Sequence, residues 1–363
     1  MNIPYHAHIL LGYVPFETVN VGDQLVSFVN TVFFDGRFRT LFCLLFGVGL
    51  AIQFSASQAK GIDSTSFLKS RLRWLLLFGC IHAVFIFGGD ILMLYSITGM
   101  LIISNLALSQ GEIIKKAKKF IIIGSILSLI MGASSAIPYA MDISALVTRG
   151  SSSFIESYDA WFFNYINQIL MQAGFAVLLL LLSPLFILWQ ALGLMYLGIY
   201  LYRDGFFENG FAANTFNKLL IVAVLSTSIC AILEWSFPLI LSEAMPAFSS
   251  VSAIFVALVY AHIAIKICQK NKPKSMFVKV FSAPGKVAFS LYIFQSILMG
   301  LLLRWVVPEF YKVMTQFDFF VLVILMTILQ IMLAKLYLNH YKQGPLEKLW
   351  RFCYASSNRN THS

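Results

Sequence analysis

The chain has 363 residues, of which 59% are hydrophobic and 12% are charged, and its mean hydropathy is +0.80. A soluble domain usually carries about 45–50% apolar and about 25% charged residues, so a soluble globule, a disordered chain and a disulfide scaffold are excluded. The net charge of +10 does not indicate a nucleic-acid partner, because the basic residues lie in the gaps between apolar runs, as in membrane proteins. The expected fold class is all-α: a polytopic bundle of membrane helices in a lipid bilayer.

A membrane helix needs roughly 20 apolar residues to cross about 30 Å of hydrocarbon. By that measure the chain contains nine predicted spans. In chain order they cover residues 39–56, 73–89, 91–108, 119–137, 180–202, 218–240, 249–267, 286–305 and 317–338. The fifth span is ambiguous, because residues 160–202 form one long apolar stretch that is broken at Ser183-Pro184.

The distribution of lysine and arginine predicts how these spans are oriented. Cytoplasmic loops collect basic residues, and the basic clusters at 60–73, 115–119, 203–218, 266–286 and 335–359 fall on one side only if the chain crosses an odd number of times between about 138 and 218. One crossing is the simplest fit. Residues 150–178 are then an interfacial helix on the outer side. We therefore predict a single membrane domain over residues 1–363, with the N-terminus outside and residues 339–363 as a cytoplasmic tail.

Ionisable side chains at membrane depth are rare and are functional candidates by default. His82 lies near the middle of the second span, and Asp90 follows eight residues later. Eight residues are a little over two helical turns, so we expect both to point to the same side of that helix. Either His82 is a neutral ring bonded to a neighbouring helix, or the two residues are catalytic.

Three further polar features lie within or beside the spans. Arg37 and Arg39 stand at the outer end of the first span, against the positive-inside rule, where they would bind an anionic group or pair with Asp35 or Asp90. Glu234 would pair with Arg304 or line a cavity. Tyr292, Gln295 and Ser296 form one polar stripe on the eighth span, which is either interhelical glue or the wall of a polar, substrate-binding cavity.

Motifs for cofactor or metal chemistry are not found in the sequence. It contains no phosphate loop, GxSxG elbow, HExxH string or Cys/His ligand cluster. No metal site is predicted, and the sequence leaves any cofactor unknown.

Four ordered blocks of residues resemble the YeiB-like bacterial inner-membrane family (domain of unknown function 418). The first runs from Asp35-Gly36-Arg37 to Gly49. The second runs from Arg71 through His82 to Gly89-Asp90, the third contains Gly285-Lys286 with Tyr292 and Gln295, and the fourth is Gly344–Arg351. The resemblance covers nearly the whole chain and implies a multi-pass protein of the bacterial inner membrane.

The start of the chain departs from the pattern that this resemblance implies. Members usually begin with a further membrane helix, which ends in a string like Asn2-Ile3-Pro4. We therefore expect a first helix to be missing, and a chain that carried it would have ten spans.

The family is distantly similar to the transmembrane acyltransferases, which move acyl groups from a cytoplasmic donor to acceptors beyond the membrane. This similarity implies that the protein transfers an acyl group from a donor such as acyl-CoA. His82 would then be the general base, with Asp90 orienting a polar partner. Arg37, Arg39, Tyr292 and Gln295 would bind the substrate. The alternatives are a small-solute transporter or channel with these residues at its binding site, or polar residues that only hold the bundle together.

Overall fold

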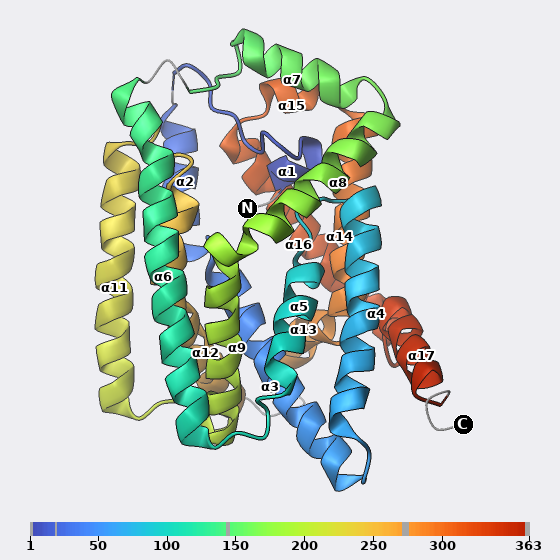
Figure 1. Cartoon of the computed structure of the whole chain (residues 1–363). Helices are drawn as coiled ribbons and strands as arrows, with labels where there is room; N and C mark the ends of the chain where they lie inside the picture. The colour runs from blue at the N-terminus through green and yellow to red at the C-terminus, as the bar shows by residue number, and fades with distance from the viewer. Residues whose placement is uncertain (1–2, 19, 143–145, 271–275, 360–363) are drawn as a thin grey trace.

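The computed structural model describes residues 3–18, 20–142, 146–270 and 276–359, and every regular element in these ranges is a helix (Figure 1). The expected all-α bundle is confirmed. The elements, in chain order, are α1 (Ile3–Ala7), α2 (Val21–Phe33), α3 (Arg37–Ala59), α4 (Ser64–Phe85), α5 (Ile91–Ile103), α6 (Gln110–Met141), α7 (Ser152–Phe162), α8 (Tyr165–Leu182), η2 (Ser183–Leu185), α9 (Ile187–Arg203), α10 (Phe206–Asn209), α11 (Ala213–Ser236), α12 (Met245–Lys270), α13 (Met276–Lys286), α14 (Ala288–Leu301), η3 (Leu302–Val306), α15 (Phe310–Val313), α16 (Gln316–Leu338) and α17 (Pro345–Arg359).

Local sequence signals explain where several helices begin. Ser109 and Glu112 form a capping box at the start of α6, and Thr315 and Asp318 form another at the start of α16. Each box satisfies backbone N–H groups that have no partner inside the helix. Proline at 184 enforces the break between α8 and α9, because it lacks a backbone N–H and occupies the first turn of the short helix η2.

Seven segments of the described chain are long and apolar enough to cross a membrane. They are Val21–Ala59, Gln110–Met141, Tyr165–Leu185, Ala213–Ser236, Met245–Lys270, Ala288–Val306 and Gln316–Leu338. All nine predicted spans lie mainly on helices, but three of them, on α4, α5 and α9, do not meet this measure. Helix α5 has 13 residues, which cover only about 20 Å.

The ambiguous region between residues 150 and 202 contains α7, α8 and α9, with the short helix η2 between α8 and α9. Helix α7 lies across one end of the bundle. From there α8 descends at a slant to η2, and α9 continues to the other end (Figure 1). The broken pair α8–α9 thus runs once from one end of the bundle to the other. The interfacial location of residues 150–178 stays a prediction.

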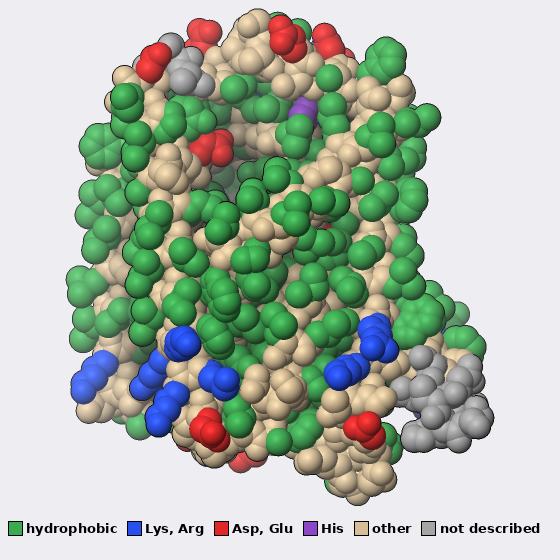
Figure 2. Space-filling view, in the orientation of Figure 1, with side chains coloured by type: hydrophobic (Ala, Val, Ile, Leu, Met, Phe, Trp, Pro, Cys, Tyr) green, Lys and Arg blue, Asp and Glu red, His purple; other side chains and the backbone are tan. Residues whose placement is uncertain are grey.

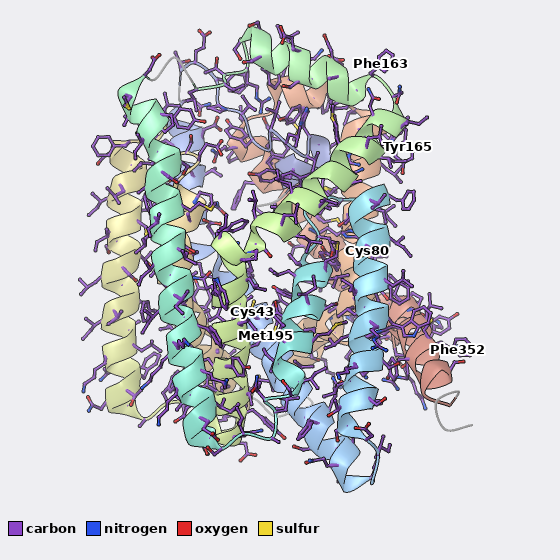
Figure 3. All side chains as sticks on the ribbon, viewed as in Figure 1. Cys43, Cys80, Phe163, Tyr165, Met195 and Phe352 are labelled. Carbon is purple, nitrogen blue, oxygen red and sulfur yellow. The ribbon has the colours of Figure 1, made fainter. Side chains whose placement is uncertain are left out.

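The two ends of the bundle differ in charge. Lys115, Lys116, Arg203 and Lys266 mark one end, which we call the basic end, and Figure 2 shows the blue side chains gathered there. Glu156, Asp159, Glu309 and Asp318 mark the opposite, acidic end. Between the ends the outward side chains are mostly apolar, as Figure 3 shows along the whole bundle, which fits a surface in contact with lipid.

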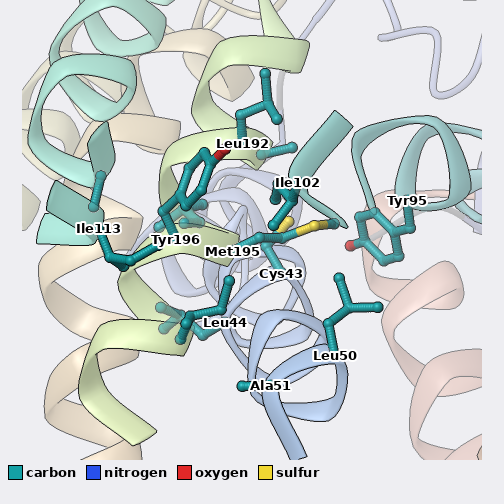
Figure 4. Close-up of a cluster of buried hydrophobic side chains, with 14 of the residues drawn as sticks. Cys43, Leu44, Leu50, Ala51, Tyr95, Ile102, Ile113, Leu192, Met195 and Tyr196 are labelled. Atoms are coloured by element: carbon teal, nitrogen blue, oxygen red, sulfur yellow. The ribbon is translucent and has the colours of Figure 1, made fainter. Parts of the chain in front are cut away.

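Helix α9 packs between α3 and α6 through glycines. A Cβ added at Gly47 would lie 2.1 Å from the carbonyl oxygen of Met195, and one at Gly198 would lie 2.0 Å from that of Leu44. Such close approach is possible only without side chains. Cys43, Leu44 and Met195 belong to the apolar core at this crossing (Figure 4).

Three irregular elements lie inside the bundle instead of at its ends. The α4–α5 connection, residues 86–90, lies partway along the bundle (Figure 1). The π-helix η3 ends α14, and the five-residue α1, whose residues Ile3, Pro4, His6 and Ala7 are buried, lies against α14. Irregular backbone at membrane depth is tolerated only where protein or a water-filled cavity surrounds it, so these elements locate the candidate site.

Candidate functional site

His82 and Asp90 form a buried pair. The His82 Nδ1 atom lies 2.8 Å from Asp90 Oδ1, and the two side chains are 1% and 0% exposed. The sequence predicted that the two residues would lie on one side of a single helix, and this explanation of their proximity is wrong. Helix α4 ends at Phe85, and Asp90 is the N-cap of α5, so the pair meets because the chain turns back over residues 86–90.

Asp90 is held by two further contacts. Its Oδ2 atom accepts a hydrogen bond of 2.8 Å from the backbone N–H of Met93, which caps α5. Its Oδ1 atom accepts one of 3.1 Å from the Tyr292 hydroxyl, and the Tyr292 and His82 ring centroids are 5.0 Å apart. His82, Asp90 and Tyr292, which we call the polar trio, therefore join α4, α5 and α14.

A glycine on α4 makes room for this arrangement. A Cβ added at Gly79 would lie 2.8 Å from Asp90 Oδ2 and 2.9 Å from Met93 N. The missing side chain, one turn before His82, lets the start of α5 approach α4 closely.

The pair has the geometry of a general base with its orienting carboxylate. An ionised carboxylate only accepts hydrogen bonds, so Nδ1 of His82 carries the hydrogen and the neutral ring has its lone pair on Nε2. That Nε2 atom is buried and has no hydrogen-bond partner within the described chain. Buried polar atoms without a partner are uncommon in native proteins, and an Nε2 lone pair that is left free can accept a proton from a substrate.

The N-terminal segment covers the trio. The His6 ring stacks on Phe87 at 4.0 Å, and Phe87 in turn lies 6.2 Å from the His82 ring. His6 Nε2 lies 3.2 Å from the Ser296 hydroxyl, and Arg304 Nε donates a hydrogen bond of 2.6 Å to the His6 carbonyl. Histidine, serine and arginine side chains from α1, α14 and η3 thus meet beside the trio.

His6 was not predicted as a site residue, and the location of Arg304 beside the trio was not predicted either. Two histidines at positions 6 and 8, just before an apolar run, were the available signal. Their position could not be inferred, because α1 is far too short to be recognised as a membrane helix.

The two arginines are not part of this site. Arg37 is 0% exposed and donates to the Asp35 carbonyl and to the Ser252 hydroxyl, 3.2 Å away on α12. Arg39 lines a separate cavity and makes no side-chain hydrogen bond or ion pair with a described residue. Their role in binding substrate stays a prediction.

The polar stripe on α14 divides among several partners. Tyr292 donates to Asp90, Ser296 lies against His6, and Gln295 accepts a hydrogen bond of 3.1 Å from Gln330 on α16. The contact of Gln295 is thus between helices. Glu234 is bonded by the Ser27 hydroxyl, not by Arg304, and it lines the same cavity as Arg39.

That cavity, near the acidic end, has a volume of about 360 Å³. It is lined by the N-terminal segment, α2, the end of α11, the α11–α12 connection and the start of α16. The face drawn in Figure 2 is hollowed towards the same end, and an acidic side chain lies in the hollow. We call this the acidic-end cavity.

Comparison with known proteins shows similarity to a family of unknown function. The profile of the family described as "Protein of unknown function (DUF418)" matches residues 201–356. The chain is 25% identical to "Uncharacterized protein YeiB" of Escherichia coli (strain K12), over 87% of this chain and 80% of YeiB. It is 36% identical to "Uncharacterized protein YxaH" of Bacillus subtilis (strain 168), over 22% of this chain and 19% of YxaH. No solved structure matches the chain.

Proposed function

We propose that this chain, which is similar to the YeiB-like membrane proteins of unknown function (DUF418), is a membrane-embedded acyltransferase. The observation that carries the proposal is the His82–Asp90 pair, in which a carboxylate fixes the imidazole and Nε2 has no hydrogen-bond partner among the described residues. This is the arrangement of base and orienting group used in acyl transfer on several unrelated folds.

In the proposed reaction, His82 acts on the acceptor. Its Nε2 atom takes the proton of an acceptor hydroxyl while the hydroxyl oxygen attacks the carbonyl carbon of an acyl thioester such as acyl-CoA. The new ester bond forms, the C–S bond breaks, and the proton passes from His82 to the departing thiolate. Asp90 stabilises the imidazolium that forms between the two transfers, and Tyr292 holds Asp90 in place.

The orientation of the protein in the membrane decides which end of the bundle meets the acyl donor. We propose that the basic end faces the cytoplasm of the bacterial inner membrane, so that α17 and the donor are on the same side. A reporter enzyme that is active only outside the inner membrane, fused after Ser363, should be inactive. An active fusion would reverse the orientation.

The test of the proposed reaction measures the release of thiol from acetyl-CoA by the purified protein in liposomes. His82→Gln should slow release by about 10²–10⁴-fold. His262→Gln is the matched control, because His262 is also buried but its one hydrogen bond within the described chain is accepted from the backbone N–H of Phe211. A wild-type rate in the His82 variant would refute the proposed role.

Asp90→Asn separates orientation from folding. The amide oxygen can still cap α5, but the amide nitrogen would face His82 Nδ1 as a donor and force the wrong tautomer. We expect up to about a 10⁴-fold loss of rate with an unchanged melting temperature. If Asp90→Asn lowers the melting temperature as well as the rate of thiol release, the pair has a structural role.

A second candidate function is transport of a small solute, and the acidic-end cavity favours it. A volume of about 360 Å³ is within the range of small-molecule sites. Uptake of solute into liposomes that is abolished by Arg39→Ala, while His82→Gln has no effect on it, would favour transport over acyl transfer.

A further inference from the structure

The acidic-end cavity carries more acidic than basic side chains. Asp23, Asp35, Glu234 and Glu243 are among its described lining residues, with Arg39 as the cation. The charges of the buried Arg37 and Arg149 act on Asp35 and Asp23, and no ion pair joins Arg39 to any of the four acids in the described parts of the chain. Glu234 and Glu243 are therefore the acids that the described chain does not pair with a cation, and their part of the cavity favours a positively charged group.

The carboxylates differ in how far the protein satisfies them. Asp23 accepts hydrogen bonds from the Tyr13 hydroxyl (2.9 Å) and from Phe317 N (3.3 Å), and Asp35 accepts one from Ser249. Glu243 accepts none from a described residue and is accessible from the cavity. Asp23 and Asp35 thus have hydrogen-bond donors within the protein, whereas Glu243 has none among the described residues.

Glu234 is the second acid with unused capacity. It is only 5% exposed, yet its Oε1 atom accepts a bond from Ser27 and its Oε2 atom accepts none from the described residues. A buried carboxylate needs compensating hydrogen bonds or an opposite charge, and Oε2 of this cavity-lining residue receives neither from the described residues.

The pKa of Tyr5 reflects the negative charges of the same cavity. Burial first, and then the negative charges of Glu243 and Asp35, raise the pKa of Tyr5 to about 12. Tyr5 lines the cavity and therefore stays a neutral hydroxyl beside these acids.

We propose that the acidic-end cavity binds a small zwitterion with a primary ammonium group and an anionic group. The ammonium group is held by Glu234 and Glu243, and the anionic group by Arg39. The guanidinium of Arg39 can donate two hydrogen bonds to a carboxylate or phosphate. Free zwitterions with a primary ammonium group and the headgroup of phosphatidylethanolamine share this chemistry. The site does not depend on the proposed acyl transfer, since it involves none of the polar trio.

The binding test uses the full chain in detergent and isothermal titration with O-phosphoethanolamine. Phosphocholine, ethanolamine and inorganic phosphate are the comparison probes. Only the primary-amine zwitterion should bind well, because phosphocholine has no N–H donor, ethanolamine has no anionic group and inorganic phosphate has no cationic group. Equal binding of phosphocholine, ethanolamine or inorganic phosphate, or no binding of O-phosphoethanolamine, would overturn the proposal.

Variants assign the two halves of the site. Glu234→Gln and Arg39→Gln should each weaken binding of O-phosphoethanolamine at least tenfold, and Arg39→Lys should keep part of it. Glu309→Gln is the matched control, because Glu309 lies at the acidic end but pairs with Lys312, 2.9 Å away, outside the cavity. Thermal unfolding of each variant detects misfolding, and wild-type affinity in a folded Glu234→Gln protein would refute the site.

The source of the ligand is decided in lipid nanodiscs. If the headgroup is the occupant, discs with phosphatidylethanolamine should lower the affinity for added O-phosphoethanolamine at least tenfold relative to discs with phosphatidylglycerol alone. Equal affinity in both discs assigns the site to a free zwitterion. Because acetyl-CoA turnover is measured separately, loss of either activity leaves the other testable.

Discussion

At the scale of single residues, Gly79 makes room for the polar trio and provides a direct test of it. In Gly79→Ala the new Cβ would lie within 3 Å of Asp90 Oδ2 and Met93 N. Overpacking of this kind costs about 1–3 kcal/mol. We expect a lower melting temperature and a slower release of thiol from acetyl-CoA.

The matched control for that variant is Gly174→Ala on α8. No heavy atom lies within 4 Å of a Cβ at this position, so the better helix propensity of alanine should leave stability unchanged or raise it by up to about 1 kcal/mol. If the two variants melt alike, α4 and α5 are not held as closely as described.

The residues of the trio were predictable from the sequence, but their contacts were not. His82, Asp90 and Tyr292 stand out because charged and polar groups are rare in apolar segments. Periodicity orders residues along one helix and says nothing about which helices face each other. His6 and Arg304 are therefore out of reach, since their contact joins positions 298 residues apart.

At the scale of helices, the crossing of α3 and α9 depends on Gly47. A Cβ there would meet the Met195 backbone, which cannot move aside as a flexible side chain could. We expect Gly47→Ala to lose stability at the upper end of the about 1–3 kcal/mol range for overpacked cores, measured by thermal unfolding in detergent.

Gly49→Ala is the control on the same helix. Its Cβ would approach only the end of the Gln53 side chain, at 3.9 Å, and we expect no loss. A similar loss in both variants would mean that helix flexibility, and not the contact with α9, explains the effect.

The positions of the helices were predicted better than which of them are long enough to cross a membrane. All nine apolar ranges lie mainly on helices, because hydrophobic length is a local property. The break between α8 and α9 was visible as Ser183-Pro184, but the shortness of α5 depends on what covers it, because irregular backbone at depth is stable only inside protein. The apolar runs in the sequence do not predict which segments pack over such elements.

At the scale of the whole molecule, His8 makes stability depend on pH. It is 0% exposed, and its Nε2 lies 3.0 Å from the Ser157 carbonyl. Burial, with a contribution from the charge of Arg304, lowers the pKa of His8 from 6.5 to about 4. Between these values the unfolded chain binds a proton that the folded chain does not, so stability falls as the pH decreases.

The expected loss from pH 6.5 to 4 is about 3 kcal/mol, and His8 adds no pH dependence above pH 6.5. Melting temperatures between pH 8 and pH 4 measure it. In His8→Gln, whose amide can still donate to the Ser157 carbonyl, the decline should be shallower. An identical decline would assign the acid sensitivity to other groups.

The short helix α5 has a consequence for access to the interior. Its 13 residues cover about 20 Å of a hydrocarbon layer about 30 Å thick, and on the acidic side the remaining depth is closed in part by α1, a helix of five residues. A molecule arriving from that side would have to displace short helices, α1 and the α7 that is hydrogen-bonded to it through Trp161 and Ala7, and would not have to separate two membrane spans. Local unfolding needs less free energy than the movement of whole helices, so the barrier to entry can be much lower than the stability of the bundle.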